Sequence, residues 1–130
     1  MLSFSVLTKP LSENTAYPTN KQGRRFLTKE AKAYKEQIAW AAKMAKQNWE
    51  EKMAKQVAPH NYIYRLDGNF RVYLEFFWED ERRRDITNFI KLVLDAMTGI
   101  MWTDDCQIKE FGCCKKEGEP RIQIFIDKIE

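Results

Sequence analysis

The chain has 130 residues, of which 44% are hydrophobic and 13% aromatic. This length supplies one hydrophobic core and not two, so we expect a single domain over residues 1–130. The net charge of +3 is too small to identify a nucleic-acid partner by itself, although the cations cluster at Lys21 to Arg25, Lys29 to Lys35 and Arg82 to Arg84. No apolar run is long enough to span a bilayer, and the first residues do not resemble a signal peptide, so we expect a soluble, cytoplasmic protein without a membrane partner.

Several kinds of site are excluded by what the chain lacks. Cys106, Cys113 and Cys114 are an odd number of cysteines with no zinc-site spacing, and His60 is the only histidine. We expect reduced thiols, at least one of them packed as a small apolar residue. A histidine-based nucleophilic triad and a glycine-rich phosphate loop are likewise missing from the sequence.

The amino-terminal half predicts a strand, a loop and a long helix. Leu2 to Val6 alternates apolar and polar residues and indicates a short strand, after which Pro10 to Gly23 is rich in turn residues and predicts a loop. Thr28 is the expected N-cap of a helix over Lys29 to about Gln56, where apolar residues recur at helical spacing.

A second strand and a second helix follow. Pro59 to Gly68 is expected to break the first helix, and the strict alternation from Phe70 to Trp78 predicts a central strand. A helix is expected from about Ile86 to Thr98, because apolar residues form one face, and Gly99 is a suitable C-terminal stop.

The chain ends with two more predicted strands, about Gln107 to Lys115 and Arg121 to Ile129. The turn-forming residues Glu117 to Pro120 between them favour an antiparallel hairpin. The order is therefore β-α-β-α-β-β. This order predicts a small α/β (α+β) fold with a mixed four-stranded sheet and two helices packed on it.

Polar residues with potential chemistry gather on the second helix. Asn88, Lys91 and Asp95 fall on the side opposite its apolar face, and an acidic pair, Asp104-Asp105, follows the helix. Asp85 lies at the helix start, where capping of open N–H groups is the simpler interpretation. The combination of Asp85 with the other groups, just after a run of arginines, instead favours metal-assisted work on a phosphate backbone.

Short motifs extend from Pro10 to the carboxyl terminus. They are Pro10-Leu11-Ser12-Glu13-Asn14 with Tyr17, Gly23-Arg24-Arg25 with Thr28 through Tyr34-Lys35, Arg84-Asp85-x-x-Asn88-x-x-Lys91-x-x-x-Asp95-Ala96, and Trp102-x-x-Asp105-x-Gln107-Ile108. In order and spacing they resemble the RusA family of Holliday-junction resolvases. The helix motif with its downstream aspartate is the most specific, because four polar positions and one later acid must agree together.

The resemblance implies a homodimeric, Mg²⁺-dependent endonuclease that binds four-way DNA junctions and nicks two opposing strands symmetrically, in recombination and repair. It places metal-binding carboxylates at the positions of Asp85, Thr87 and Asp105, and a catalytic lysine at Lys91. The chain departs from the family at Thr87, where many members have aspartate. Loss of this acid removes one strong ligand for a hard cation, and Asp95, Asp104 or a water are the candidates to replace it.

The roles expected from the resemblance follow from phosphodiester hydrolysis. Asp85 and Asp105 would hold Mg²⁺, for which Mn²⁺ is a possible substitute, and would be catalytic together with Lys91. Lys91 would place a positive charge on the transition state or orient the nucleophile. Asn88 would position Asp85 or the phosphate. Asp95 would tether Lys91, four residues earlier, although an ordinary solvated helix contact is an equally good interpretation of that pair.

DNA contacts are expected mostly to phosphate, because a junction is distinguished by shape. The candidate residues are Tyr17, Lys21, Arg24, Arg25, Lys29, Arg82, Arg83 and Arg84. Tyr17 is the one expected to stack on an unpaired base.

Two other functions remain open from the sequence. The first is a branched-DNA-binding protein that no longer cuts because Thr87 replaces an acid. The second is a small structural or regulatory domain in which Asp85 only caps a helix and Lys91 is only solvated.

Overall fold

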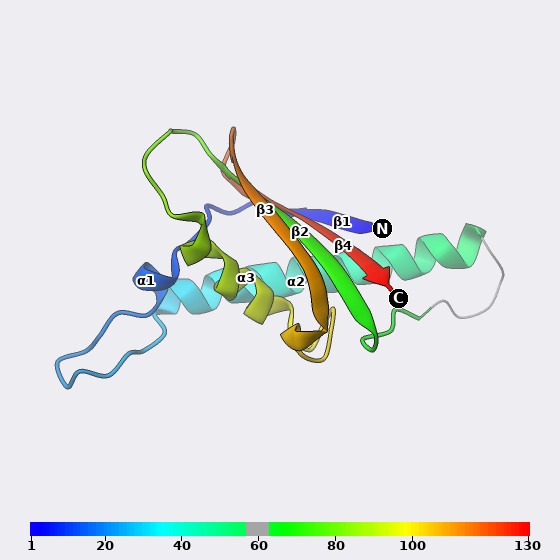
Figure 1. Ribbon diagram of the computed structural model, residues 1–130, viewed down its shortest axis with the longest axis horizontal. Helices are drawn as coiled ribbons and strands as arrows, with labels where there is room; N and C mark the ends of the chain where they lie inside the picture. The colour runs from blue at the N-terminus through cyan, green and yellow to red at the C-terminus, as the bar shows by residue number, and fades with distance from the viewer. Residues whose placement is uncertain (57–62) are drawn as a thin grey trace.

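Four strands form one mixed sheet in the spatial order β1-β4-β2-β3, and the main helices pack on one of its faces (Figure 1). The computed structural model describes residues 1–56 and 63–130. Its elements are β1 (Leu2–Val6), α1 (Glu13–Ala16), α2 (Lys29–Gln56), β2 (Asn69–Trp78), η1 (Ile86–Phe89), α3 (Ile90–Met97), η2 (Asp105–Gln107), β3 (Ile108–Glu117) and β4 (Arg121–Ile129). The predicted α+β fold with a mixed four-stranded sheet is confirmed.

The alternation of β2 places its apolar residues in the core. Phe70, Val72, Leu74 and Phe76 are each at most 1% exposed, and they pack with residues of α2 and α3. Tyr73 points to the opposite, open face, where its ring lies 6.1 Å from that of Phe125. The predicted central position of β2 is confirmed, since β4 and β3 flank it.

The predicted hairpin of the last two strands is wrong. β3 pairs in parallel with β2, and β4 pairs antiparallel with the other side of β2 and with β1. The turn before β4 passes the end of β2, where the Gly118 N–H donates to the Trp78 carbonyl at 2.9 Å. Burial explains the arrangement: Ile122, Ile124 and Ile126 are buried, which an interior strand allows, whereas β3 is largely exposed and suits an edge.

The long helix and its cap are as predicted. The Thr28 hydroxyl accepts a hydrogen bond from the Ala31 N–H at 3.1 Å, which satisfies an open donor in the first turn of α2. Tyr34, Ile38 and Ala42 of this helix are buried. The part of the predicted break that includes Pro59 lies outside the described residues.

The second helix differs from the prediction at its start. Its first turn, η1, is a 3₁₀ helix, and α3 then continues to Met97. Gly99 has φ +88° immediately beyond the C-cap residue Thr98, so the predicted glycine stop is confirmed.

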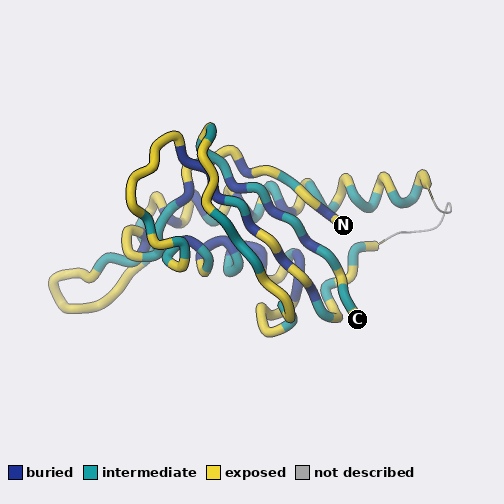
Figure 2. Tube along the Cα trace, turned by 45° about the horizontal axis from the view of Figure 1, so that its top comes forward, coloured by how far each residue is buried: buried dark blue, intermediate teal, exposed yellow. Residues whose placement is uncertain are grey.

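The predicted loop before α2 contains the short helix α1. The Ser12 side chain accepts from the Thr15 N–H at 3.2 Å and caps it. Beyond α1, residues 17–27 project from the body and are exposed over much of their length (Figures 1 and 2). α1 contacts η1, so this segment begins beside the start of the second helix.

The cysteines are free thiols in the structure, as predicted. Cys113 packs against the core, whereas Cys106 is exposed. Among the described residues, no helix is long and apolar enough to cross a membrane.

Candidate active site

A cleft of about 320 Å³ opens where η1 begins, between α1 and the loop that follows β2. Ser12, Asp85 and Asn88 are among its lining residues. Asp85 has an extended backbone and its side chain makes no capping hydrogen bond, while its exposed carboxylate is accessible to solvent. Asp85 is therefore the N-cap residue of η1 as the simpler interpretation predicts, but its side chain caps no N–H group, and the carboxylate is available to a ligand.

Lys91 lies six residues after Asp85, on the exposed side of α3. Its Nζ is 3.3 Å from Asp95 Oδ2, so the predicted pair is present. The pKa of Lys91 is raised above its usual value, mainly by Asp95, with smaller contributions from Asp105 and Glu13. Asp95 is thus the contact partner of this ammonium group, while Asp105 and Glu13, from two other segments, add to the electrostatic preference for its charged form.

The two downstream aspartates have different environments. The Asp104 carboxylate accepts from the Cys106 N–H at 2.9 Å and forms a capping box with Gln107. The pKa of Asp104 is lowered, mainly by hydrogen bonds from the Cys106 backbone and side chain and then by the neighbouring Asp105 side chain. Asp104 is thereby committed to the turn, whereas Asp105 is exposed in the first turn of η2 and within electrostatic range of Lys91.

The donor chemistry of Asp85 and Asp105 fits a hard divalent cation, because both carry exposed carboxylates and such ions prefer oxygen ligands. Along the chain, Asp85 directly precedes η1, and Asp105 begins η2 after α3. Asp105 does not line the cleft that contains Asp85. Within residues 1–56 and 63–130, no three Asp, Glu, His or Cys side chains are grouped closely enough to hold a metal ion. Any such ion would therefore retain several waters, as Mg²⁺ commonly does.

Arg84 is anchored by the protein itself. Its side chain is only 10% exposed, with Nη1 2.7 Å from Asp80 Oδ1 and the guanidinium 4.7 Å from the Trp78 ring centroid. The Lys115 ammonium donates to the Arg84 carbonyl at 2.9 Å. These contacts hold the residue directly before Asp85, so Arg84 is placed to fix the position of that carboxylate.

The remaining cations predicted to contact DNA are more accessible. Lys21, Arg24, Arg25, Lys29, Arg82 and Arg83 are all exposed. Tyr17 is only partly exposed, because its ring packs against the core and under the Arg25 guanidinium at 5.3 Å. The basic residues therefore lie on two segments, the projecting residues 17–27 with the start of α2, and the loop before η1.

The sequence model of the family described as "Endodeoxyribonuclease RusA" matches residues 8–127 of the 130. The chain belongs to the RusA endodeoxyribonuclease family. Membership in this family implies endonuclease activity in the resolution of Holliday junctions. Among curated proteins, none matches this RusA-family chain significantly.

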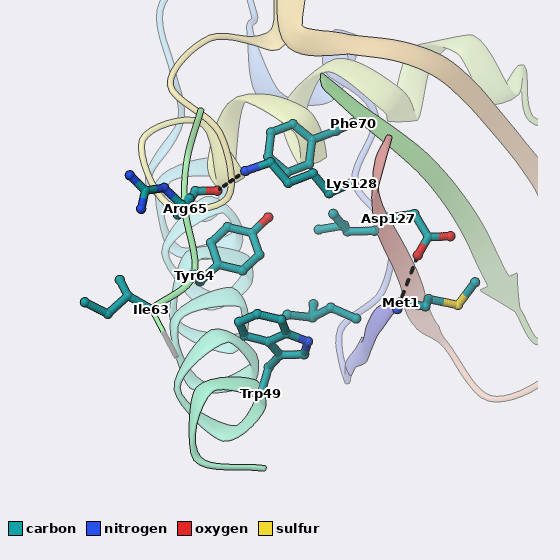
Figure 3. Close-up of a pocket in the computed structure, with 10 residues that line it drawn as sticks. Met1, Trp49, Ile63, Tyr64, Arg65, Phe70, Asp127 and Lys128 are labelled. Carbon is teal, nitrogen blue, oxygen red and sulfur yellow. Dashed lines mark hydrogen bonds and ion pairs between the residues drawn. The ribbon is translucent and has the colours of Figure 1, made fainter. Parts of the chain in front are cut away.

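A second cavity of this RusA-family protein, about 340 Å³, lies at the opposite end of β2 (Figure 3). The aromatic rings of Trp49, Tyr64 and Phe70 line it. At its rim the amino terminus of Met1 lies 3.3 Å from Asp127. It contains none of the residues predicted to act on DNA.

Two acidic residues near the RusA-family motifs were missed by sequence reasoning. The turn-rich composition predicts a loop at Glu13, although the Ser12-x-x-Thr15 capping pattern gives a signal for the helix that carries it. Asp80 was not considered, although its spacing of four residues from Arg84 was a usable signal for an ion pair. Both act near the start of the second helix.

Proposed function

We propose that this chain is a divalent-metal-dependent endonuclease that binds four-way DNA junctions and resolves them by paired, symmetric nicks during recombination and repair. The observation that carries the proposal is the exposed Asp85 carboxylate, which caps nothing and lines a cleft in a RusA-family chain. We also infer a cytoplasmic location, where such DNA is processed.

Asp85 and Asp105 are the residues that would hold Mg²⁺, and Mn²⁺ suits the same oxygen ligands. The ion would supply Lewis-acid polarisation of the scissile phosphate. Thr87 contributes a hydroxyl where many family members have a carboxylate, so its ligand strength is lower. Asp104 is a poor replacement, because its carboxylate already caps η2.

Lys91 acts on the phosphate. As water attacks phosphorus and the bond to the leaving oxygen breaks, negative charge develops on the phosphate oxygens, and the Lys91 ammonium counters it. Asp95 holds the ammonium in place through the 3.3 Å contact. Asn88, in the same cleft as Asp85, positions that carboxylate or the phosphate. Asp85, Lys91 and Asp105 are therefore the proposed catalytic residues.

DNA binding is assigned to the exposed cations. Lys21, Arg24, Arg25, Lys29, Arg82 and Arg83 would contact phosphates, so affinity should fall steeply with salt. Arg84 and Tyr17 were predicted to share this role, but their side chains already contact other groups of the protein. We assign Arg84 mainly to positioning Asp85.

Replacing Arg84 with glutamine tests that positioning role. We expect slower cutting, by roughly tenfold, with an unchanged salt dependence of junction affinity, because a lost phosphate contact would instead lower the slope of log affinity against log salt by about one. Two hydrogen bonds to the Asp80 carboxylate, one from the Arg84 guanidinium and one from the Arg82 N–H, lower the pKa of Asp80 from 3.8 to about 2.

The same ion pair has a defined pH dependence. The pKa of Asp80 is lower in the folded protein than in the unfolded chain. The ion pair therefore contributes fully to the free energy of unfolding when the pH is above the unfolded-state pKa near 3.8, and this contribution is lost as the pH falls through the folded-state pKa of about 2. NMR titration of the Asp80 carboxyl group should reproduce this value in the parent chain and a higher one in Arg84→Gln. A parent pKa near 3.8 would contradict the ion pair.

A homodimer follows from the two nicks, since each needs its own active site. Sedimentation should give twice the chain mass of 15.5 kDa. A monomer that nevertheless makes paired nicks in one binding event would contradict this part of the proposal.

The second candidate function is a junction-binding protein with weakened or lost cutting. It is favoured by Thr87 and by the lack of a three-ligand group in the described part of the chain. Incubating the protein with a synthetic four-way junction and Mg²⁺ or Mn²⁺ separates the two. Paired nicks are expected on the junction and not on linear duplex; binding without nicks at every metal concentration would establish the second candidate.

A further inference from the structure

The segment of residues 17–27 is a defined hairpin. Its base is closed where the Thr28 N–H donates to the Ala16 carbonyl at 3.1 Å, and Thr19 bridges Arg25 across the two sides. At the tip, Asn20 Oδ1 accepts from the Arg24 N–H at 2.9 Å. We call residues 17–27 the arm; it extends away from the sheet, between α1 and α2, in Figure 1.

The charge of the arm and its flanks has one sign. Between Glu13 and Glu30 the sequence has four cations, Lys21, Arg24, Arg25 and Lys29, and no acid. Among the described residues none of these cations forms an ion pair with an acid. A surface of this kind favours a polyanion over a protein partner of mixed charge.

An exposed aromatic ring lies within this charge. Phe26 is 45% exposed and its backbone N–H bonds to the Pro18 carbonyl at 3.2 Å, so the backbone is held while the ring is accessible. Tyr17, by contrast, already packs against the core and under Arg25. Aromatic rings among cations are the usual platform on which nucleic-acid bases stack.

The arm starts beside the candidate active site. Ser12, which caps α1, lines the same cleft as Asp85, and Glu13 of α1 is within electrostatic range of Lys91. Phe26 lies near the base of the arm, two residues before Thr28, and its N–H donates to the carbonyl of Pro18, which follows α1 closely. A strand bound at Asp85 would therefore have neighbouring nucleotides within reach of Phe26.

We propose that the arm is a DNA-binding hairpin and that Phe26 is its base-stacking residue, which contacts a base exposed at the branch point of the junction. The inference rests on the proposed junction-binding function. It assigns selectivity for branched DNA to Phe26, because bases of linear duplex remain stacked on one another, and general affinity to the surrounding cations.

Phe26→Ala tests the stacking role in an Asp105→Asn background, so that binding is measured without cutting. We expect junction affinity to fall roughly tenfold and duplex affinity to change little, which follows from the loss of one stacked base. Phe26→Trp should restore junction affinity. Phe111→Ala is the matched control, since Phe111 is 40% exposed on the edge strand β3, and it should bind like the parent.

A second measurement reports on the base itself. With 2-aminopurine at the branch point, the protein-dependent fluorescence change should be lost in Phe26→Ala and kept in Phe26→Trp and Phe111→Ala. Arg24→Gln should instead weaken junction and duplex alike and lower the salt slope by about one.

The outcomes separate this inference from the proposed function. If the parent binds the junction but Phe26→Ala has unchanged affinity and fluorescence, the arm inference is overturned and the proposed function stands. A parent chain with no preference for junctions overturns both. If Phe26→Ala turns a dimeric parent into a monomer, with circular dichroism unchanged, the arm is a subunit contact and the inference is again overturned.

Discussion

Asp105→Asn should reduce cutting of a four-way junction by roughly two to three orders of magnitude, the loss typical of removing one group that stabilises a transition state. Asp105 is exposed, so the substitution leaves no buried group unpaired. Asparagine keeps the size and one oxygen but removes the charge that a hard cation prefers. Junction affinity and thermal unfolding should remain close to those of the parent. Initial cutting rates under Mg²⁺ and gel-shift binding without metal measure the two effects.

The neighbouring residue provides a matched control. Asp104 carries the same charge one position earlier, but its carboxylate caps η2 by accepting from the Cys106 N–H. Asparagine also caps well, so Asp104→Asn should retain both the turn and the cutting rate. Equal losses in the two variants would mean that net negative charge in this turn, and not Asp105 itself, supports cutting, and our site assignment would then be wrong.

Thr87→Asp should increase cutting. The new carboxylate would lie in η1, two residues after Asp85, where the resemblance to the RusA family implies an acid. An added anionic oxygen ligand strengthens binding of a hard cation, so we expect half-maximal cutting at roughly tenfold lower Mg²⁺ concentration. Thr87 is exposed, so the change should have little effect on folding. Cutting rates across a Mg²⁺ titration measure the effect.

Thr87→Asn separates charge from shape. Asparagine matches aspartate in size but adds no charge, so its titration should stay near that of the parent. A Thr87→Asp variant that cuts no better than Thr87→Asn at any metal concentration would indicate that the natural site does not lack a ligand at this position. The parent chain would then be a complete enzyme, with its ligands drawn from elsewhere.

Much of the fold was predictable because local patterns agree with burial. The alternation from Phe70 to Trp78 identified a strand whose apolar side is in the core, and the helical spacing after Thr28 identified α2 and its cap. The pairing of the last two strands was not predictable in this way. A short turn between two strands usually means a hairpin, but α3 returns the chain so that β3 runs parallel to β2.

The family, the mixed sheet with its helices and the polar side of the second helix can be read from residue order and period alone. Which charged groups are available to a ligand depends instead on how the chain is folded. Asp85 and Asp104 both precede a helical turn, yet only Asp104 caps it. Arg84 and Arg83 are adjacent, yet Arg84 packs on Trp78 while Arg83 is exposed. The partners are close in sequence, namely Cys106 for Asp104 and Asp80 and Trp78 for Arg84. Whether each side chain reaches its partner depends on the backbone geometry that the packed fold imposes.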